Sequence, residues 1–274
     1  MKKVGLALGG GGARGFCHIV FLEALDDMGI KPEIIAGTSI GAIVGAFYAA
    51  GYSGAEIRAI VDKMGLRDIN KMLDFNLLHR AMLKGNGVTD FFNKYIKIKT
   101  FEELETPLKV VATDFWQHSQ VVLQSGELIP AVRASMSIPA IFEPVLHNNQ
   151  VLIDGGAVNP LPYDIIRKDC DVLIAIDVSG HPKIRKKSKM PTIFDSVMNT
   201  FQIMQDSILA AKRQIADIDV YVKPDIEGIG ILEFFRYREI MSGAEKDVQK
   251  FKAEVKQALQ RTGPLAFLNK KPGR

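Results

Sequence analysis

The sequence predicts an α/β fold of three layers, in which helices cover both faces of a mostly parallel central sheet. Three observations predict this fold. Short apolar runs of strand length alternate with segments of helical period over the first fifty residues. Glycine-rich turns follow the first two of these runs. The run DVLIAIDV at 171–178 is apolar without strict alternation, as in a strand buried on both faces.

The elements follow in order along the chain. KVGLAL at 3–8 is expected to form the first strand, and GFCHIVFLEALDDMG at 15–29 a helix that stops at Gly29. EIIAG at 33–37 predicts the second strand, and IGAIVGAFYAAGY at 40–52 the second helix. Later strands are expected at 107–115, 121–123, 151–156, 171–178 and 219–224, and later helices at 194–215 and 238–262.

Length and composition favour one globular domain in a reducing compartment. The chain has 274 residues, of which 47% are apolar and 24% charged. Neither a repeat nor a long linker divides it, so we expect a single domain over 1–274, with a motif-bearing core at about 3–180 and a helical part at about 190–265. Cys17 and Cys170 stand alone in apolar stretches, which argues against a disulfide framework or a cysteine metal site. A cytoplasmic location is therefore expected.

Charge and hydropathy restrict the partners. The net charge of +4 does not require nucleic acid, although clustered basic residues would suit an anionic surface. The basic run HPKIRKKSK at 181–189 predicts a loop that could touch anionic headgroups at a membrane. Residues 64–92 carry apolar side chains without one clean period. Two interpretations stay open: short helices that pack on the main core, or a lid or platform for an acyl chain.

Two stretches imitate membrane signals. The apolar part of the N-terminus, residues 4–8, is too short for a signal peptide, and Arg14 interrupts the small, uncharged residues after it. Residues 34–55 lack charge, but Gly37, Thr38 and Ser39 divide them into a strand and a short helix. We therefore expect no membrane span in either stretch.

The first glycine-rich turn is open to more than one interpretation. Gly10, Gly12 and Gly15 follow a strand and open a helix, as in a dinucleotide-binding fingerprint. The next strand, however, ends without the acidic residue that such a site uses to hold a ribose. A P-loop would need Lys-Ser/Thr after Gly15, where this chain has Phe16 and Cys17.

The second turn suggests nucleophilic catalysis. Gly37, Ser39 and Gly41 form G-x-S-x-G at a strand-to-helix turn, where a serine hydroxyl can be exposed in a strained conformation. Because the first glycine loop comes from the adjacent strand, its bare amides are placed to stabilise a tetrahedral oxyanion. Together the two turns predict an acyl-transfer site.

The base that would activate Ser39 has two candidates. One is a histidine; the chain has His18, His79, His118, His147 and His181. Only His181 follows Asp154 in chain order, as an α/β-hydrolase would require, and it lies in the basic run. The other candidate is Asp154 itself, which ends a strand before Gly155 and Gly156 and could take the serine proton directly.

The motifs GGGGARG, GTSIG and DGG, in this order, resemble those of the bacterial patatin-like phospholipases. Two further segments resemble the sequence between and after these motifs in that family: AVRASMSIPAIFEPV at 131–145 and NPLPYDIIRKDCDVLIAIDVS at 159–179. The resemblance implies that Ser39 is the nucleophile and Asp154 its general base. It also implies an oxyanion hole at Gly10, Gly11 and Gly12, with Arg14 ordering the loop or attracting an anionic headgroup. Supporting motif positions are Arg14, Gly15, Gly37, Gly41, Gly155 and Gly156.

The resemblance implies hydrolysis of lipid carboxylic esters without a metal or organic cofactor, by a protein that is cytoplasmic or peripheral at a membrane. Two other functions stay open. One is a Ser-His-Asp esterase of the α/β-hydrolase class, and the other is a non-catalytic nucleotide-binding or regulatory domain. The lipid, its acyl position and the oligomeric state do not follow from the sequence.

Overall fold

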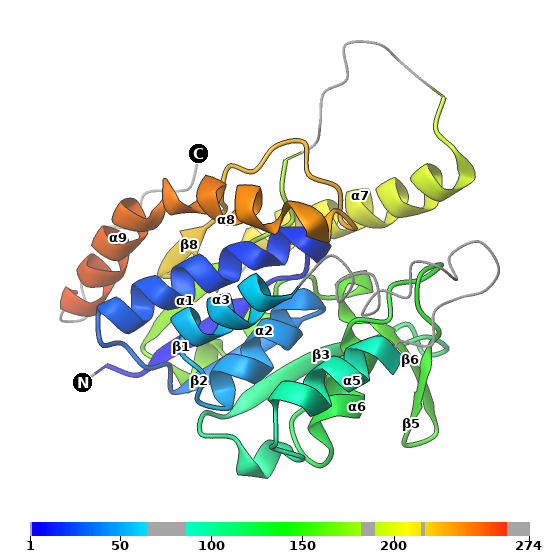
Figure 1. The fold of residues 1–274 in the computed structure, drawn as a ribbon, viewed down its shortest axis with the longest axis horizontal. Coiled ribbons are helices and arrows are strands. Elements are labelled where there is room, and N and C mark those ends of the chain that lie inside the picture. Colours follow the sequence, from blue (N-terminus) through cyan, green and yellow to red (C-terminus); the bar gives the residue numbers. More distant parts are fainter. Residues whose placement is uncertain (1, 65–85, 182–189, 215–216, 262–274) are drawn as a thin grey trace.

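The computed structural model describes residues 2–64, 86–181, 190–214 and 217–261. These residues form a three-layer α/β/α fold around one eight-stranded sheet (Figure 1). The strand order is β5-β6-β3-β2-β1-β7-β8, and β4 pairs with β3 outside this path. The strands are β1 (Val4–Leu8), β2 (Ile34–Thr38), β3 (Leu108–Asp114), β4 (Ser119–Leu123), β5 (Val145–His147), β6 (Gln150–Asp154), β7 (Val172–Ile176) and β8 (Val220–Val222).

The sheet is mostly parallel, as predicted. β3, β2, β1, β7 and β8 run parallel to one another, whereas β4 and β6 pair antiparallel with β3, and β5 pairs antiparallel with β6. The antiparallel strands all lie at the β3 end of the sheet. The carboxyl ends of β1, β2 and β3 therefore meet at one edge, which we call the catalytic edge, with a hairpin of antiparallel strands beside it.

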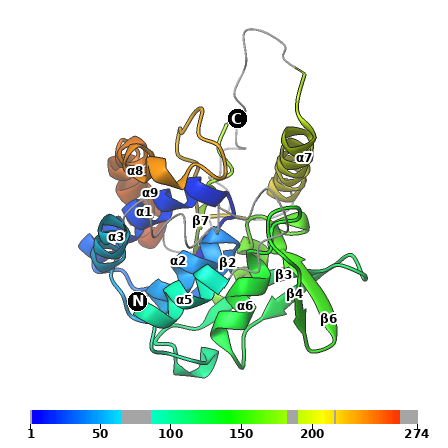
Figure 2. The same ribbon diagram turned by 45° about the vertical axis from the view of Figure 1, so that its right-hand side comes forward.

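Helices of two kinds cover the two faces. One face packs under α1 (Cys17–Asp27), α2 (Ile40–Ala49), α6 (Leu128–Ser135), α8 (Tyr237–Glu245) and α9 (Val248–Gln260), with α3 (Gly54–Lys63) and α5 (Asn86–Tyr95) beside them. The other face packs under the short 3₁₀ helices η5 (Tyr163–Ile165) and η6 (Arg167–Asp169) and under α7 (Ile193–Arg213), which reaches it through Leu209. Figure 2 shows α7 well separated from α1, α8 and α9.

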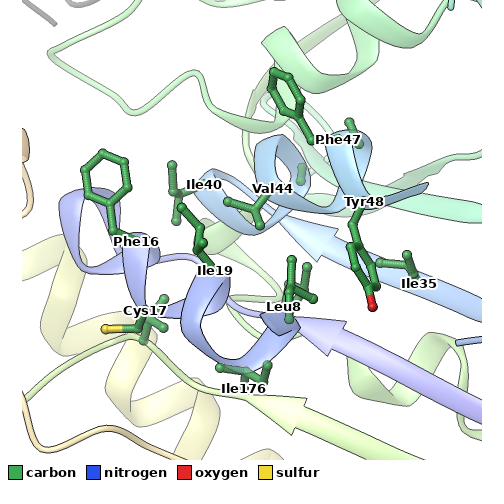
Figure 3. Packing of buried hydrophobic residues seen from close by; sticks show 14 of the residues in the cluster. Leu8, Phe16, Cys17, Ile19, Ile35, Ile40, Val44, Phe47, Tyr48 and Ile176 are labelled. Carbon is green, nitrogen blue, oxygen red and sulfur yellow. The ribbon is translucent and has the colours of Figure 1, made fainter. Parts of the chain in front are cut away.

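The core follows from the alternation of side chains along the central strands. Leu8 of β1 and Ile176 of β7 face the helical layer, where Figure 3 shows them near Ile19 and Val44. Ala7 of β1, between two such leucines, faces the opposite layer. Larger residues therefore lie under the long helices, and small ones allow the η5–η6 segment to approach the sheet closely.

One predicted helix is divided in the structure. The sequence predicted a single helix over 238–262, and the structure has α8 and α9 with a turn at Lys246 and Asp247. α8 packs on α1 and on the glycine loop, whereas α9 reaches β7 and β8, so the turn redirects the chain from one region to the other.

Some predictions fall outside the described residues. Those for 65–85 and for 182–189, the greater part of the basic run, cannot be placed. In the described parts of the chain, none of the helices has both the length and the apolar character needed to cross a bilayer.

Candidate active site

Ser39 stands on a strained turn between β2 and α2. Its φ of 55° and ψ of −123° lie in a region that residues with a Cβ rarely adopt. The glycines on either side make the turn possible. A Cβ at Gly41 would overlap the carbonyl oxygen of Leu8, and one at Gly37 would crowd the carbonyl oxygen of Gly41. The G-x-S-x-G pattern is thus a packing requirement of this turn.

A second serine supports the backbone of Ser39. The Ser39 amide donates to Ser135 Oγ at 2.9 Å, and Ser135 Oγ donates to the Val111 carbonyl at 2.6 Å. The Ser39 carbonyl accepts from the amides of Ala42 and Ile43. Ser135 was not singled out from the sequence. The only signal was its place in the segment 131–145, which resembles patatin-like text.

Strand pairing on β3 brings Asp154 to Ser39. Thr38 of β2 pairs with Val111, and Asp154 of β6 pairs with the next residue, Ala112. β4 occupies the other edge of β3 at both positions. β2 and β6 therefore share one edge of β3 and approach it from opposite directions, so that their carboxyl ends meet. Residues 115 positions apart become neighbours in this way.

The two side chains form a direct hydrogen bond. Ser39 Oγ donates to Asp154 Oδ2 at 2.6 Å, and the Gly156 amide donates to Asp154 Oδ1 at 2.7 Å. Asp154 is 1% exposed, and burial raises its pKa to about 6, although these two hydrogen bonds oppose the rise. The pair combines a hydroxyl proton with an acceptor whose proton affinity is raised by desolvation.

The glycine loop adjoins Ser39 and presents two amides. A Cβ at Gly10 would lie 3.3 Å from the Cβ of Ser39. The Gly10 amide, however, donates to the Pro160 carbonyl at 2.8 Å, and the Ala13 amide to Ile231. Within the described residues, the amides of Gly11 and Gly12 meet no hydrogen-bond acceptor. Of the three glycines expected to form an oxyanion hole, Gly11 and Gly12 have amides available.

The buried side chains of Arg14 and His18 fix the orientation of two peptide groups in this loop. Arg14 Nε donates to the Gly11 carbonyl at 3.2 Å, and His18 Nε2 donates to the Gly9 carbonyl at 2.8 Å. Arg14 is 4% exposed, so its position suits ordering the loop rather than meeting a headgroup. In a trans peptide, the carbonyl and the following amide point in opposite directions. Arg14 thereby directs the Gly12 amide away from itself.

Burial keeps His18 neutral. It lowers the His18 pKa to about 4, mainly by desolvation. His18 contacts the loop and not Ser39. His118, His147 and His181 likewise make no described contact with Ser39, and among the described residues His181 Nε2 lies 3.9 Å from a carboxylate oxygen of the exposed Asp225. His79 lies outside the described residues. The structure therefore pairs Ser39 with Asp154 and with none of the described histidines.

Ser39 lines an apolar cavity. The other lining residues come from η1 (Gly12–Phe16), α1, α2, α3, α5, the loop after α6, and η7 (Phe234–Arg236) with the residue two positions before it, and Ser39 supplies the one hydroxyl group among the described lining residues. The lining residues are Gly12, Phe16, Ile19, Ser39, Ile40, Ile43, Val44, Phe47, Ile57, Ile60, Val61, Met64, Phe91, Phe92, Met136, Ile138, Phe142, Leu232 and Phe234. Met64, Phe91 and Phe92 belong to the segment 64–92, for which a lid and core helices were both open.

The site offers no group of metal ligands in the described residues. Its chemistry is that of a hydroxyl, a carboxylate, bare amides and an apolar cavity.

Comparison with known proteins gives concordant results. The family model described as patatin-like phospholipase matches residues 6–166. An uncharacterized NTE family protein of Mycobacterium tuberculosis is 35% identical over 179 residues, which are 65% of this chain and 49% of that protein. The patatin-like phospholipase domain-containing protein 7 of Mus musculus is 31% identical over 266 residues, 87% of this chain and 20% of its own.

Two solved structures share the fold. VipD from Legionella pneumophila superimposes with a TM-score of 0.52 at 14% identity, over 92% of this chain and 66% of that one. The type III effector protein ExoU gives 0.50 at 13% identity, over 95% and 54%. The match to this chain spans about half of the length of the mycobacterial relative and about a fifth of the length of the mouse relative. With a family model matched over more than half of its residues, the chain belongs to the patatin-like phospholipase family.

Proposed function

We propose that the protein hydrolyses carboxylic esters of lipids through an acyl-enzyme on Ser39. One observation carries the proposal: the Ser39 hydroxyl donates to a buried carboxylate, and Ser39 lines an apolar cavity. Family membership and the name of a Kluyveromyces lactis relative, Lysophospholipase NTE1, which is 28% identical over 271 residues, support it.

In the first half-reaction, Ser39 Oγ attacks the ester carbonyl while Asp154 Oδ2 takes its proton. The C–O π electrons move to the carbonyl oxygen, and the amides of Gly11 and Gly12 donate to this oxyanion. On collapse, Asp154 returns the proton to the leaving alcohol and the acyl group stays on Ser39. In the second half, Asp154 takes a proton from water as the water oxygen attacks the acyl carbon. When this intermediate collapses, the bond from the acyl carbon to Ser39 Oγ breaks, Asp154 returns the proton to Oγ, and the fatty acid is released.

The raised pKa of Asp154 suits both roles. A carboxylate with an ordinary pKa is a weak base, whereas a value of about 6 keeps the group ionised at neutral pH and a stronger proton acceptor. No histidine is needed for this cycle, and none of those in the described residues reaches Ser39.

The substrate proposal follows from the cavity. Its apolar lining fits a fatty acyl chain and offers no cation or carboxylate in the described residues. We propose a phospholipid or lysophospholipid substrate, a cytoplasmic location with peripheral membrane contact, and one domain over 1–274. The basic run that suggested anionic headgroups lies outside the described residues from 182 onward.

A nucleotide-binding function is disfavoured by the same loop. A phosphate cradle needs several convergent free amides. The Gly9, Gly10 and Ala13 amides already donate to carbonyls of the protein, which leaves only those of Gly11 and Gly12 in the described loop.

Three variants test the proposal. We expect Ser39→Ala and Asp154→Ala each to lower kcat/KM for a short-chain nitrophenyl ester by about 10³–10⁴-fold, and His181→Ala to keep wild-type activity. Labelling by a fluorophosphonate should be abolished in Ser39→Ala and unchanged in His181→Ala. Full activity in Ser39→Ala would refute the mechanism. Loss in His181→Ala with retention in Asp154→Ala would establish a Ser-His-Asp site instead.

A further inference from the structure

The exposed apolar side chains of the protein are gathered at the catalytic edge. Every large apolar side chain that is exposed in the described residues belongs to one of three places. These are the β3–β4 turn with the adjacent β5–β6 hairpin, α7 with the residues just before it, and η7. We call these three places together the apolar rim. Its most exposed members include Trp116 at 73%, Leu146 at 73% and Ile193 at 87%.

The first place projects beyond the site. The Phe115 amide donates to the Val151 carbonyl at 2.8 Å, and Val151 pairs with Leu146, so these residues form a row across three strands. Phe115 lies four residues after Val111, the partner of Thr38, which places the row about 13 Å beyond the end of β2. The buried carboxylate of Asp114 accepts from the amides of Trp116 and Gln117 and fixes the turn.

The other two places flank the same edge. The outer end of α7 and the β5–β6 hairpin both lie on the right of Figure 1, beyond the carboxyl ends of the central strands. η7 contributes Phe234 to the lining of the cavity and leaves Phe235 exposed beside it. The rim therefore lies at the edge that carries Ser39, and one of its elements, η7, also lines the cavity.

The chemistry of the rim suits a lipid surface. An acyl chain must reach a cavity whose lining is apolar, and a rim in contact with a bilayer spares that chain a passage through water. In the first place, amides and an imidazole adjoin the exposed side chains: Gln117 and His118 in one turn, Asn148 and Asn149 in the next. On α7 and η7 the neighbours include Asp195 and Arg236, which carry opposite charges. Tryptophan with polar neighbours is typical of the membrane–water interface. Separate projecting tips fit a flat, yielding surface better than a shaped protein partner.

We infer that the apolar rim docks the catalytic edge onto the surface of a phospholipid bilayer, with Trp116, Leu146 and Ile193 entering the interface. This inference rests on the proposed function for its lipid substrate. Because the tips carry aliphatic and aromatic groups, docking is expected on zwitterionic vesicles, without a requirement for anionic lipid.

Trp116 is the single tryptophan of the chain and reports on its own environment. The experiment uses full-length Ser39→Ala protein, which leaves the vesicles intact, with phosphatidylcholine vesicles. We expect the emission of Trp116 to shift to shorter wavelength and to be quenched by lipids brominated on their acyl chains. Co-sedimentation with the vesicles should change little between low and high salt. Emission that stays unchanged at saturating lipid would overturn the inference.

Two surface variants and one control assign the contact. Leu146→Ser and Ile193→Ser, each in the Ser39→Ala background, should weaken vesicle binding by about tenfold. Gln257→Ala, on the exposed side of α9, should bind as the parent does. Equal binding by all three, or a lipid-free dimer that Leu146→Ser dissociates, would contradict docking to a bilayer. Hydrolysis of a short-chain nitrophenyl ester by the wild type, measured in parallel without vesicles, tests the proposed function separately.

Discussion

Two glycine-rich turns lie side by side at the catalytic edge and differ in the hydrogen bonding of their backbone amides. In the turn of Ser39, the amide and the carbonyl are both hydrogen-bonded, and the strained conformation is held from α6 and α2. In the loop of Gly11 and Gly12, the amides have no acceptor among the described residues, while side chains hold the carbonyls of Gly9 and Gly11.

The difference matches the two tasks that we propose. A nucleophile must stay in one position before the substrate arrives, so its backbone is fully bonded. An oxyanion exists only during the reaction, so its donors must be oriented but unoccupied at rest. Glycine serves different purposes in the two turns: close packing beneath Ser39, and exposure of amides in the loop.

Outside the pair of Ser39 and Asp154, the largest loss of activity is expected from closing the open loop. Gly12 has a φ of 59°, and a Cβ there would overlap the carbonyl of Ile231. Gly12→Ala should therefore displace the loop and lower kcat for a nitrophenyl ester by about 10²–10³-fold. Gly29→Ala is the matched control, since Gly29 has a φ of 66° but open space around its Cβ position. It should keep full activity and lose about 1 kcal/mol of stability. Equal activity in both variants would remove the loop from the mechanism.

The second prediction concerns the charge of Asp154 and its effect on activity and stability. Folding raises the pKa of Asp154 from 3.8 to about 6, so the folded state favours the protonated form. The activity should fall about tenfold per pH unit below pH 6, because the carboxylate is the base. The buried charge costs up to about 3 kcal/mol above pH 6 and nothing below about pH 4.

Asp154→Asn should therefore be inactive yet more stable than the wild type at pH 8, with a difference that vanishes as the pH falls to about 4. Urea unfolding at the two pH values measures it. A variant less stable than the wild type at pH 8 would show that the hydrogen bonds of the carboxylate outweigh its desolvation.

The smallest effect is expected from loosening the bonded turn. Ser135→Ala leaves the Ser39 amide and the Val111 carbonyl without the hydroxyl that joins them. We expect a loss of about 1–3 kcal/mol in stability and about tenfold in kcat, with little change in KM. Ser207→Ala on α7, whose hydroxyl bonds only within its own helix, is the control. A rise in KM with unchanged kcat would contradict a role in holding the nucleophile.

Much of this architecture could be predicted from the sequence, because strand-length runs and glycine turns are local signals. Ser39 and Asp154 were identified by their turns, with Asp154 as one of two candidate bases for Ser39, and the family resemblance favoured Asp154 over a histidine. Their contact depends on β6 pairing with the same edge of β3 as β2 but in the opposite direction, and no local sequence pattern predicts such a pairing. The occupied amide of Gly10 depends on a carbonyl at Pro160, 150 positions away, and was equally invisible. Ser135 joins Ser39 to Val111 of β3 through hydrogen bonds between residues far apart in the sequence, and nothing in the sequence around Ser135 predicts them.

The meeting of β2 and β6 on β3 also has a consequence for folding. The contact between Ser39 and Asp154 requires two non-local strand pairings in the correct register. β2 pairs with β3 up to Val111, and β6 pairs with β3 from Ala112 onward. Contacts of such sequence separation form slowly, since their loops must close first. The reactivity of Ser39 toward a fluorophosphonate during refolding would therefore time the completion of the sheet.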